Sequence, residues 1–451
     1  MLASRHWMMR PLALLRRQPW PMPAPFPSLD PSQPIEEENT PYYDPKRFYP
    51  AHLGQVLNDR YQLVNKLGYG SSSTVWLARD LCHCRWLTER YVAVKISANR
   101  HHSRDSAAAR ELEMLRRIST ADPSHPGWEF VRKLLDSFVV DGAFGSHVCL
   151  VFEPLREPLW LFRRRFVDDV IPSDILKIML QMTLQGLDYL HSECHVIHTG
   201  WSPAVFHSNH CLYSVENVHN VTNHGTDLKM DNIMVMIEDP SMLDRYARDE
   251  LDNPLPQKQC EDGRLIYLSR NNYGKPAAGT GMIRITDFDL AVAGDSSSRM
   301  GSIQADVYRA PEVILEAGYT YSADIWNLGV LLWDLLEGRP LFEAVDELKG
   351  AKYDEKKHLA YISALLGPAP TDLLNRGRRT SIFYRPDGNL GNAELIPKDF
   401  SFENNLSRIT GEDKAMFIDF VKRMIMWRPE ERSSAKGLLT DPWLHADFPS
   451  E

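Results

Sequence analysis

The feature that most constrains this chain is a six-residue segment that combines an acid, a cation and an amide, Asp227-Leu228-Lys229-Met230-Asp231-Asn232. The Asp227 carboxylate is suited to accept the proton of an attacking hydroxyl, the Lys229 cation to stabilise moving negative charge, and the Asn232 amide oxygen to hold a metal ion. Six residues are weak on their own. The chain must therefore supply the remaining groups of the same chemistry, in the right order, on both sides.

Length and composition are those of a globular protein with room for more than one compact unit. The chain has 451 residues, of which 43% are hydrophobic and 25% charged. Its formal net charge of −9 argues against direct binding to nucleic acid. It contains no run of 18 apolar residues, so no membrane partner is expected. Six cysteines in so long a chain favour reduced thiols inside the cell over a disulfide framework.

Residues 1–40 differ from the rest in composition. Seven prolines stand between positions 19 and 34, and four arginines precede the first acidic residue, Asp30. Proline at this density prevents regular helix or sheet, which predicts a disordered Pro/Arg-rich tail. Arginine without acids is also typical of a mitochondrial transit peptide, so mitochondrial targeting stays open beside the disordered tail.

A glycine-rich turn follows a predicted strand over Tyr61–Leu67. Gly68 and Gly70 would let backbone N–H groups approach phosphate oxygens closely, and Val75 would cover an adenine ring. A plain hairpin has a similar pattern.

The next strand strengthens this interpretation, because Tyr91–Ile96 is apolar apart from Lys95. A buried lysine is costly unless it is paired, and phosphate oxygens and a helical glutamate would supply the pairing. The helix predicted over residues 105–118 offers Glu111 and its competitor Glu113; the register with the following apolar residues favours Glu111.

Two further strands, over 134–140 and 147–152, lead to a connection that begins at Phe152. Phe152 would stand at the back of the adenine pocket, and backbone groups near Glu153 and Leu155 would bind the adenine edge. The predicted nucleotide-binding residues are Leu67, Gly68, Gly70, Val75, Ala93, Lys95, Glu111, Phe152, Glu153 and Leu155.

A strong helix is predicted over Ser173–Ser192, and His198-Thr199 should then lead directly to Asp227. Residues 200–225 intervene instead. Removing Gly200–Thr226 joins Thr199 to Asp227 without a break in the motif. Two interpretations of this insertion stay open. The clean join favours a translated intron. The alternative is a genuine loop, since a loop of this length can be closed at modest entropic cost. A genuine loop would put at risk the contact by which His198 braces the catalytic loop.

Past the opening segment, residues 238–281 are predicted to form a surface insertion. Asp287 in Asp287-Phe288-Asp289 fits a metal-binding aspartate, although Asp289 replaces the usual flexible glycine and adds a carboxylate nearby. Farther on, Ala310-Pro311-Glu312 is expected to end a segment beside the site, and Arg432 is placed to pair with Glu312.

Taken in order, these motifs resemble the eukaryotic protein kinases from about Tyr61 to Leu444, and more closely the SR-protein kinase family, which phosphorylates serine in Arg/Ser-rich splicing factors. The closer resemblance rests on Lys66-Leu67-Gly68-Tyr69-Gly70, Ser73-Thr74-Val75-Trp76, Cys149-Leu150-Val151-Phe152-Glu153, Leu365-Leu366-Gly367 and His198-Thr199 rejoined to Asp227. It implies the α+β, bilobal protein-kinase fold. Residues 41–155 would form a small β-rich N-lobe and residues 156–451 a larger, mainly helical C-lobe.

The resemblance also implies a function, that of an ATP- and Mg²⁺-dependent, non-specific serine/threonine protein kinase. Asp227 would be the base and Lys229 would support the γ-phosphate, while Asn232 and Asp287 would hold the metal. The implied partners are ATP and protein serine in Arg/Ser-rich substrates. A monomer acting in the cytoplasm and nucleus is expected.

Two departures bear on substrate and regulation. Lys357 and Ala364 stand where family members carry acids that dock Arg-rich substrates. Nearby acids either substitute for these or form a solvated face, and they are Glu343, Asp346, Glu347, Asp354 and Glu355. The second departure is from protein kinases in general and belongs to the resemblance to the SR-protein kinase family: Thr199 stands where other kinases carry an arginine that binds a phosphorylated activation loop, so activity should not require that modification.

Two alternatives to the protein kinase remain. A pseudokinase or scaffold would bind nucleotide without turnover, because the catalytic loop is interrupted and Asp289 disturbs the metal site. A small-molecule kinase is disfavoured by Ala310-Pro311-Glu312 and by C-terminal helices that suit a protein substrate.

Overall fold

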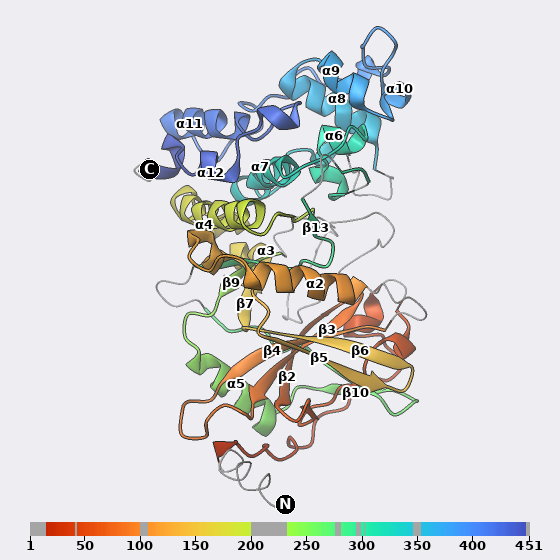
Figure 1. Cartoon of the computed structure of the whole chain (residues 1–451), viewed down its shortest axis with the longest axis vertical. Coiled ribbons are helices and arrows are strands. Elements are labelled where there is room, and N and C mark those ends of the chain that lie inside the picture. Colours follow the sequence, from red (N-terminus) through yellow and green to blue (C-terminus); the bar gives the residue numbers. More distant parts are fainter. Residues whose placement is uncertain are drawn as a thin grey trace, which may run out of the picture.

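The computed structural model describes residues 15–40, 43–99, 107–199, 232–275, 281–294, 299–301, 303–345 and 353–447. The strands gather in one half of the molecule and most helices in the other (Figure 1). The α+β, bilobal arrangement predicted from the sequence is therefore confirmed. None of the helices in the described ranges combines the length and apolar character that a membrane span requires.

The N-lobe is built on an antiparallel sheet with the strand order β1-β2-β3-β4-β6-β5. Its strands are β1 Val56–Leu57, β2 Tyr61–Gly70, β3 Ser73–Asp80, β4 Tyr91–Ser97, β5 Asp136–Gly142 and β6 Gly145–Phe152. Apolar residues on both faces of β4 make it a central strand. Helix α2, Ala107–Thr120, packs on the sheet through Leu115 and Ile118, because residues at this spacing share one helix face.

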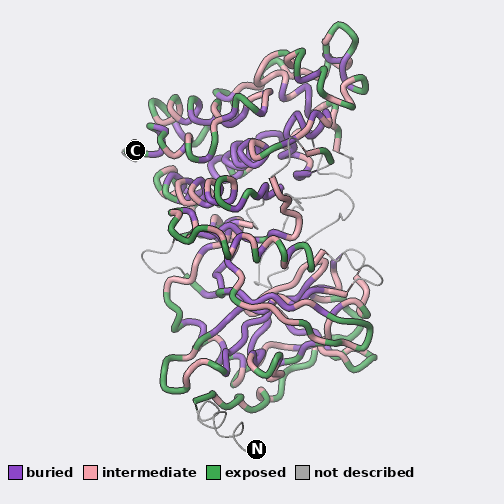
Figure 2. Tube along the Cα trace, in the orientation of Figure 1, coloured by how far each residue is buried: buried purple, intermediate pink, exposed green. Residues whose placement is uncertain are grey.

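The C-lobe is organised around α7, Ser322–Leu336, in which every residue from Ala323 to Leu336 is buried. The tube of α7 accordingly runs purple through the helical half in Figure 2. A helix that is apolar all round must be covered on all sides. The other described helices of this lobe are α3 Leu159–Phe162, α4 Ser173–Ser192, α6 Pro311–Ile314, α8 Glu355–Leu366, α9 Thr371–Arg376, α10 Thr380–Phe383, α11 Gly411–Lys422 and α12 Ala435–Leu438.

Two small sheets carry the segments that flank the site. One has the order β12-β9-β7, with β7 at Leu155–Pro158, β9 at Ile233–Met236 and β12 at Ile283–Ile285. The other pairs β8, Val196–Ile197, with β13, Val292–Ala293. Ile233 lies opposite Ile285, so Asn232 and Thr286, which flank this pair, are brought side by side.

The prediction of a disordered tail is wrong for the described residues 15–40. The Trp20 ring lies against the guanidinium groups of Arg79 and Arg248, at 4.1 and 5.0 Å. The Trp20 backbone also exchanges two hydrogen bonds with the Gln62 side chain. This segment contains a short 3-10 helix, Glu36–Asn39, and the chain before it lies along a folded surface, where Trp20 is partly buried.

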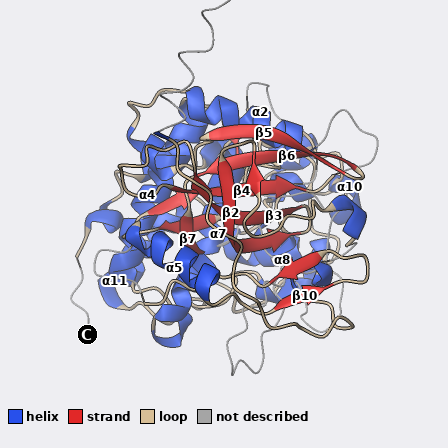
Figure 3. Ribbon diagram, turned by 90° about the horizontal axis from the view of Figure 1, so that it is seen from below, coloured by secondary structure: helices blue, strands red, loops and turns tan. Residues whose placement is uncertain are grey.

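The insertion predicted over 238–281 is likewise more than a surface loop. It contains α5, Ser241–Asp252, and a hairpin of β10, Gln257–Gln259, with β11, Leu265–Tyr267. Helix α5 packs on β2 in the N-lobe, although its sequence neighbours belong to the small sheets beside the site. Figure 3 shows α5 and β10 on the N-lobe side of the molecule. Met242, Leu243 and Ala247 form the apolar face that drives this contact.

The tail and the insertion meet at a buried cation on β2. Lys66 is 1% exposed, forms ion pairs with Glu36 and Glu37, and donates to the Tyr267 carbonyl at 3.0 Å. Glu36 also accepts two hydrogen bonds from Ser269. Because charges this deep must be matched, Lys66 ties both segments to the strand that leads into the glycine-rich turn.

Replacing Lys66 by methionine should leave Glu36 and Glu37 buried without their cation. We expect the free energy of unfolding to fall by about 3–5 kcal/mol, measured by chemical denaturation. The exposed Lys436 of α12 is the control, and Lys436→Met should change the same quantity by less than about 0.5 kcal/mol. Equal midpoints for the two variants would show that Lys66 does not join these segments.

Candidate functional site

The glycine-rich turn connects β2 and β3, with Gly68 opposite Val75 in the register. A Cβ atom placed on Gly68 would meet no protein atom within 4 Å, so the space above this turn is open to a ligand. Leu67 and Val75 are partly buried, whereas Ala93 is 1% exposed and lies opposite Phe152 on β6. The predicted residues of the adenine pocket thus come from neighbouring strands of one sheet.

Lys95 on β4 is the centre of the polar site. Its Nζ lies 2.7 Å from Oε1 of Glu111 on α2 and 3.5 Å from Oδ1 of Asp287. Glu111 is 4% exposed, while its competitor Glu113 lies on the exposed side of the helix. The structure therefore brings together Lys95, Glu111 and Asp287, as the sequence predicted.

The charges in this cluster shift one another's ionisation. Burial alone would lower the pKa of Lys95, but Glu111, Asp287 and Asp289 together raise it above its ordinary value. Burial raises the pKa of Glu111, an effect that the Lys95 cation opposes. Lys95 therefore stays charged, which is the state needed to attract phosphate oxygens.

Asn232 and Asp287 provide the donor atoms for a metal ion. The main-chain carbonyl of Asn232 accepts hydrogen bonds from the Thr286 backbone N–H at 2.8 Å and from the Thr286 hydroxyl at 3.2 Å. This holds Asn232 beside the residue that precedes Asp287, whose side chain is 43% exposed. Asp287 has φ +64°, a strained conformation that concentrates at functional sites. An amide and an accessible carboxylate suit Mg²⁺, which prefers oxygen ligands.

The connection between the lobes begins where β6 ends. Glu153 is exposed, and its carboxylate pairs with Arg284 of β12 at 2.6 Å. Leu155 is the first residue of β7 and lies opposite Met236 of β9. Phe152, Glu153 and Leu155 thus lie along the connection from β6 to β7, and their contacts with adenine stay a prediction.

Asp324 on α7 holds the backbone at the point where the chain enters the catalytic loop. Asp324 accepts hydrogen bonds from the backbone N–H groups of His198 at 2.8 Å and Thr199 at 3.1 Å. The His198 ring contacts the Thr286 carbonyl at 3.0 Å and packs against Phe288. His198 is therefore held against Thr286 and Phe288, while the loop that it is expected to brace begins beyond Thr199. Asp227, Lys229 and the insertion 200–225 lie outside the described residues.

A glutamine that the sequence analysis did not single out holds the segment beyond Asp287. Gln304 donates through its backbone to the Thr199 carbonyl at 3.1 Å, and its side chain bonds Ala310 and Ala323 at 2.9 and 2.8 Å. Its φ of +67° fits a tight, locally constrained turn. The Thr199 hydroxyl donates to the Leu290 carbonyl at 2.7 Å. Neutral hydrogen-bonding groups thus hold Gln304 and Thr199 in place.

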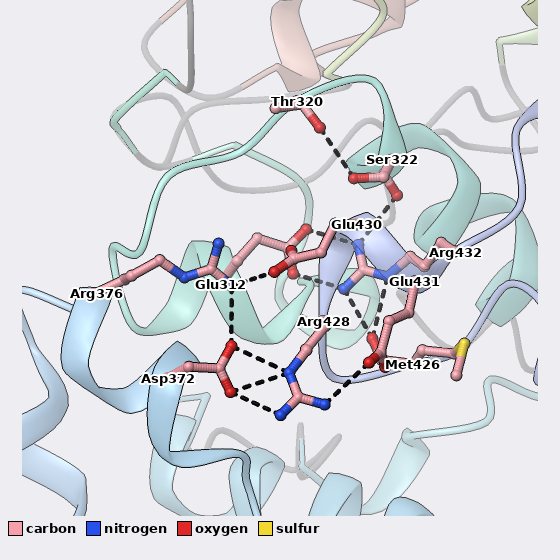
Figure 4. A network of polar contacts seen from close by, with 10 residues as sticks. All are labelled: Glu312, Thr320, Ser322, Asp372, Arg376, Met426, Arg428, Glu430, Glu431 and Arg432. Atoms are coloured by element: carbon pink, nitrogen blue, oxygen red, sulfur yellow. Dashed lines mark hydrogen bonds and ion pairs between the residues drawn. The ribbon is translucent and has the colours of Figure 1, made fainter.

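The predicted partnership of Glu312 and Arg432 is present and fully buried. Two hydrogen bonds of 2.7 Å join the carboxylate to the guanidinium, and both side chains are 0% exposed. Arg432 also donates to the carbonyls of Met426 and Ser322, and its cation lies 4.9 Å from the Trp326 ring centre (Figure 4). Every donor is thereby matched, which is the condition under which a buried pair is stable.

Two acids considered for docking of Arg-rich substrates already have internal partners. Asp354 caps α8 by accepting from the backbone of Lys356 and Lys357. Glu355 binds Arg379 at 2.8 and 2.6 Å and lies 3.6 Å from Arg309. Neither is therefore an unengaged substitute for the family's docking acids; Asp346 and Glu347 lie outside the described residues.

Comparison with known proteins now identifies the fold and its chemistry. The model of the family described as "Protein kinase domain" matches residues 61–200 and 202–444. The chain belongs to the protein kinase family. This kinase is 38% identical over 427 residues to a serine/threonine protein kinase of Aspergillus fumigatus, covering 94% of this chain and 95% of that protein. It is 30% identical over 420 residues to the serine/threonine-protein kinase SRPK of Physarum polycephalum, covering 92% of each.

A solved structure agrees with the fold. The crystal structure of another kinase domain superposes with a TM-score of 0.61 at 23% identity, covering 89% of this kinase and 100% of that chain. The predicted resemblance to protein kinases, and in particular to the SR-protein kinase family, is confirmed by these relatives. The chain is thus a serine/threonine protein kinase, and its fold implies ATP and a divalent metal ion.

Sequence reasoning assigned no role to Asp324 or Gln304. For Asp324 a signal existed, since an acid within an otherwise apolar helix must find donors. Gln304 carries no such signal, because a glutamine is common on surfaces and only its position relative to Thr199 and Ala310 reveals its role.

Replacing Arg432 by methionine should lower the free energy of unfolding by about 3–5 kcal/mol, because the Glu312 charge stays buried without a partner. The matched control is Arg428, which pairs with Asp372 in the same network but with side chains 35% and 52% exposed. Arg428→Met should cost no more than about 1 kcal/mol. Denaturant unfolding of both variants measures the difference; similar losses would contradict a special role for the buried pair.

Proposed function

We propose that this serine/threonine kinase transfers the γ-phosphate of ATP to serine in Arg/Ser-rich proteins. The observation that carries the proposal is the cluster of Lys95, Glu111 and Asp287 beside Asn232. The cation is Lys95, the helical residue that anchors it is Glu111, and the two candidate metal ligands are Asn232 and Asp287. All belong to the site below the open turn at Gly68. This is the arrangement that phosphoryl transfer requires.

In this proposal Lys95, oriented by Glu111, binds the α- and β-phosphates beneath the open turn at Gly68. Asn232 and Asp287 hold Mg²⁺, which when bound neutralises phosphate charge. Phe152 closes the back of the adenine pocket, and the backbone at Glu153 and Leu155 binds the adenine edge. Lys95 lies on a strand, Glu111 lies on helix α2, and Asn232 and Phe152 lie at strand ends, so regular elements set the positions of these groups.

Asp227 would accept the proton of the substrate hydroxyl, and Lys229 would support the γ-phosphate. Both belong to the segment between two fixed points, since Asp324 holds Thr199 on one side and Thr286 holds Asn232 on the other. The bonds of Gln304 and Thr199 support an activation segment that needs no phosphorylation.

The choice of Arg/Ser-rich substrates is supported by the likeness to the Physarum SRPK. Because Asp354 and Glu355 are engaged internally, we place substrate arginine recognition at other acids.

Asp227→Asn should lower turnover by about a thousandfold or more, because proton acceptance is lost, while the affinity for Mg·ATP stays unchanged. Radiolabelled phosphate transfer and titration calorimetry measure the two quantities. Asp231→Asn, in the same loop, is the matched control and should retain most activity. Normal turnover of the Asp227 variant would refute its role as base.

A peptide panel tests the substrate. We expect Arg/Ser repeats to be phosphorylated with a kcat/KM at least about tenfold above that of acidic and proline-directed peptides, because charge complementarity at the substrate is worth this much. The panel should be run on the full chain and on a chain without residues 200–225. Preference for acidic peptides in both forms would refute the Arg/Ser assignment and leave the kinase assignment intact.

A further inference from the structure

A second cation, Arg132, lies behind the nucleotide pocket and has no role in the mechanism above. It belongs to the segment between α2 and β5. Its backbone N–H donates to the Ile285 carbonyl at 2.9 Å, and the preceding Val131 forms a parallel bridge with Ile285. Arg132 is therefore held against β12, the strand that ends two residues before Asp287.

The side chain of Arg132 is half-buried and lies on an aromatic ring. Its guanidinium carbon is 4.2 Å from the ring centre of Phe152, the residue at the back of the predicted adenine pocket. Its Nε atom is buried and has no hydrogen-bond partner among the residues that the structure describes. The ring compensates part of the lost hydration, but a cation in this place also requires anions nearby.

The anions that favour its charge are those of the active site. Burial lowers the pKa of Arg132 to about 10, and Glu111 and then Asp287 oppose this effect. The neighbouring cation Arg284 pairs with Glu153 at 2.6 Å, so it balances the negative charge of Glu111 and Asp287 less than Arg132 does. Glu111 and Asp287 are thus the carboxylates that most favour the charged form of Arg132.

The charge balance around Lys95 explains why a second cation is useful. Three carboxylates act on Lys95, those of Glu111, Asp287 and Asp289. With Lys95 alone the cluster carries excess negative charge, which repels phosphate and pushes Glu111 and Asp287 apart. Arg132 lowers this excess from a position fixed by the Phe152 ring and by the Ile285 carbonyl.

We infer that Arg132 is a positioning residue of the nucleotide site: from behind Phe152 it balances Glu111 and Asp287, so that Lys95 can bind the phosphates. This inference rests on the proposed ATP site but not on the proposed Arg/Ser substrate. It predicts that Arg132 acts on nucleotide affinity through Glu111.

The test measures the dissociation constant for Mg·ATP by titration calorimetry on the full chain. Arg132→Met should weaken binding about tenfold, the usual size of a coupling through one nearby charge. Arg132→Lys, which keeps the charge, should restore binding to within about threefold. The matched control is Lys133→Met, because Lys133 lies over Trp128 and its charge responds to Glu129 and Glu153. This control should leave the affinity within about twofold of the original.

A double-mutant cycle separates positioning from mere packing. In a Glu111→Gln background the anion that Arg132 balances is gone, so Arg132→Met should weaken binding by less than about threefold. A full tenfold loss in that background, an equal loss in Lys133→Met, or unchanged affinity in Arg132→Met would overturn the inference. The peptide panel can fail without affecting this result, since calorimetry requires no protein substrate.

Discussion

A single buried carboxylate, that of Asp324, holds the chain where it enters the catalytic loop. It accepts hydrogen bonds from the backbone of both His198 and Thr199 and contacts the ring of His191. Asp324 can do this because α7 is covered by the rest of the C-lobe on every side, so the carboxylate cannot move to solvent. The geometry of the site therefore begins in the apolar core: the helix fixes Asp324, and Asp324 fixes the backbone of His198 and Thr199.

The ion pairs of this kinase divide by burial into two kinds with different tasks. Glu312 and Arg432 are sealed from water, and each N–H group of the Arg432 guanidinium has an acceptor. Such a pair suits a permanent structural support within the C-lobe. Lys95 and Glu111 are also close, but the adjoining Asp287 is partly exposed. An accessible, strained carboxylate can exchange a protein partner for a metal ion, whereas a sealed pair cannot. Rigidity and reactivity thus lie in separate parts of the fold.

The N-lobe depends on segments that the sequence places far from it. The tail at Trp20 and the insertion containing α5 both pack on β2, and Lys66 joins them through Glu36, Glu37 and the Tyr267 carbonyl. Proline content predicted no helix in the tail, which contains the short 3-10 helix Glu36–Asn39, and it carried no information about burial. An extended chain loses little by lying on a surface when it gains ion pairs and aromatic contacts there. The insertion follows the same logic, because the apolar face of α5 needs a partner.

The sequence by itself determined the order of the motifs, the two-lobed fold, the strand that carries Lys95 and the partnership of Glu312 with Arg432. The two-lobed fold follows from the resemblance of the ordered motifs to protein kinases, and the strand of Lys95 from the cost of an unpaired buried charge. Only the tertiary structure decided that Gln304 holds the activation segment, that Asp354 and Glu355 are engaged, and that Arg132 lies behind Phe152. Such roles arise from contacts between residues far apart in the chain, and a side chain's partners depend on how its surroundings pack. Residue type alone does not specify those surroundings.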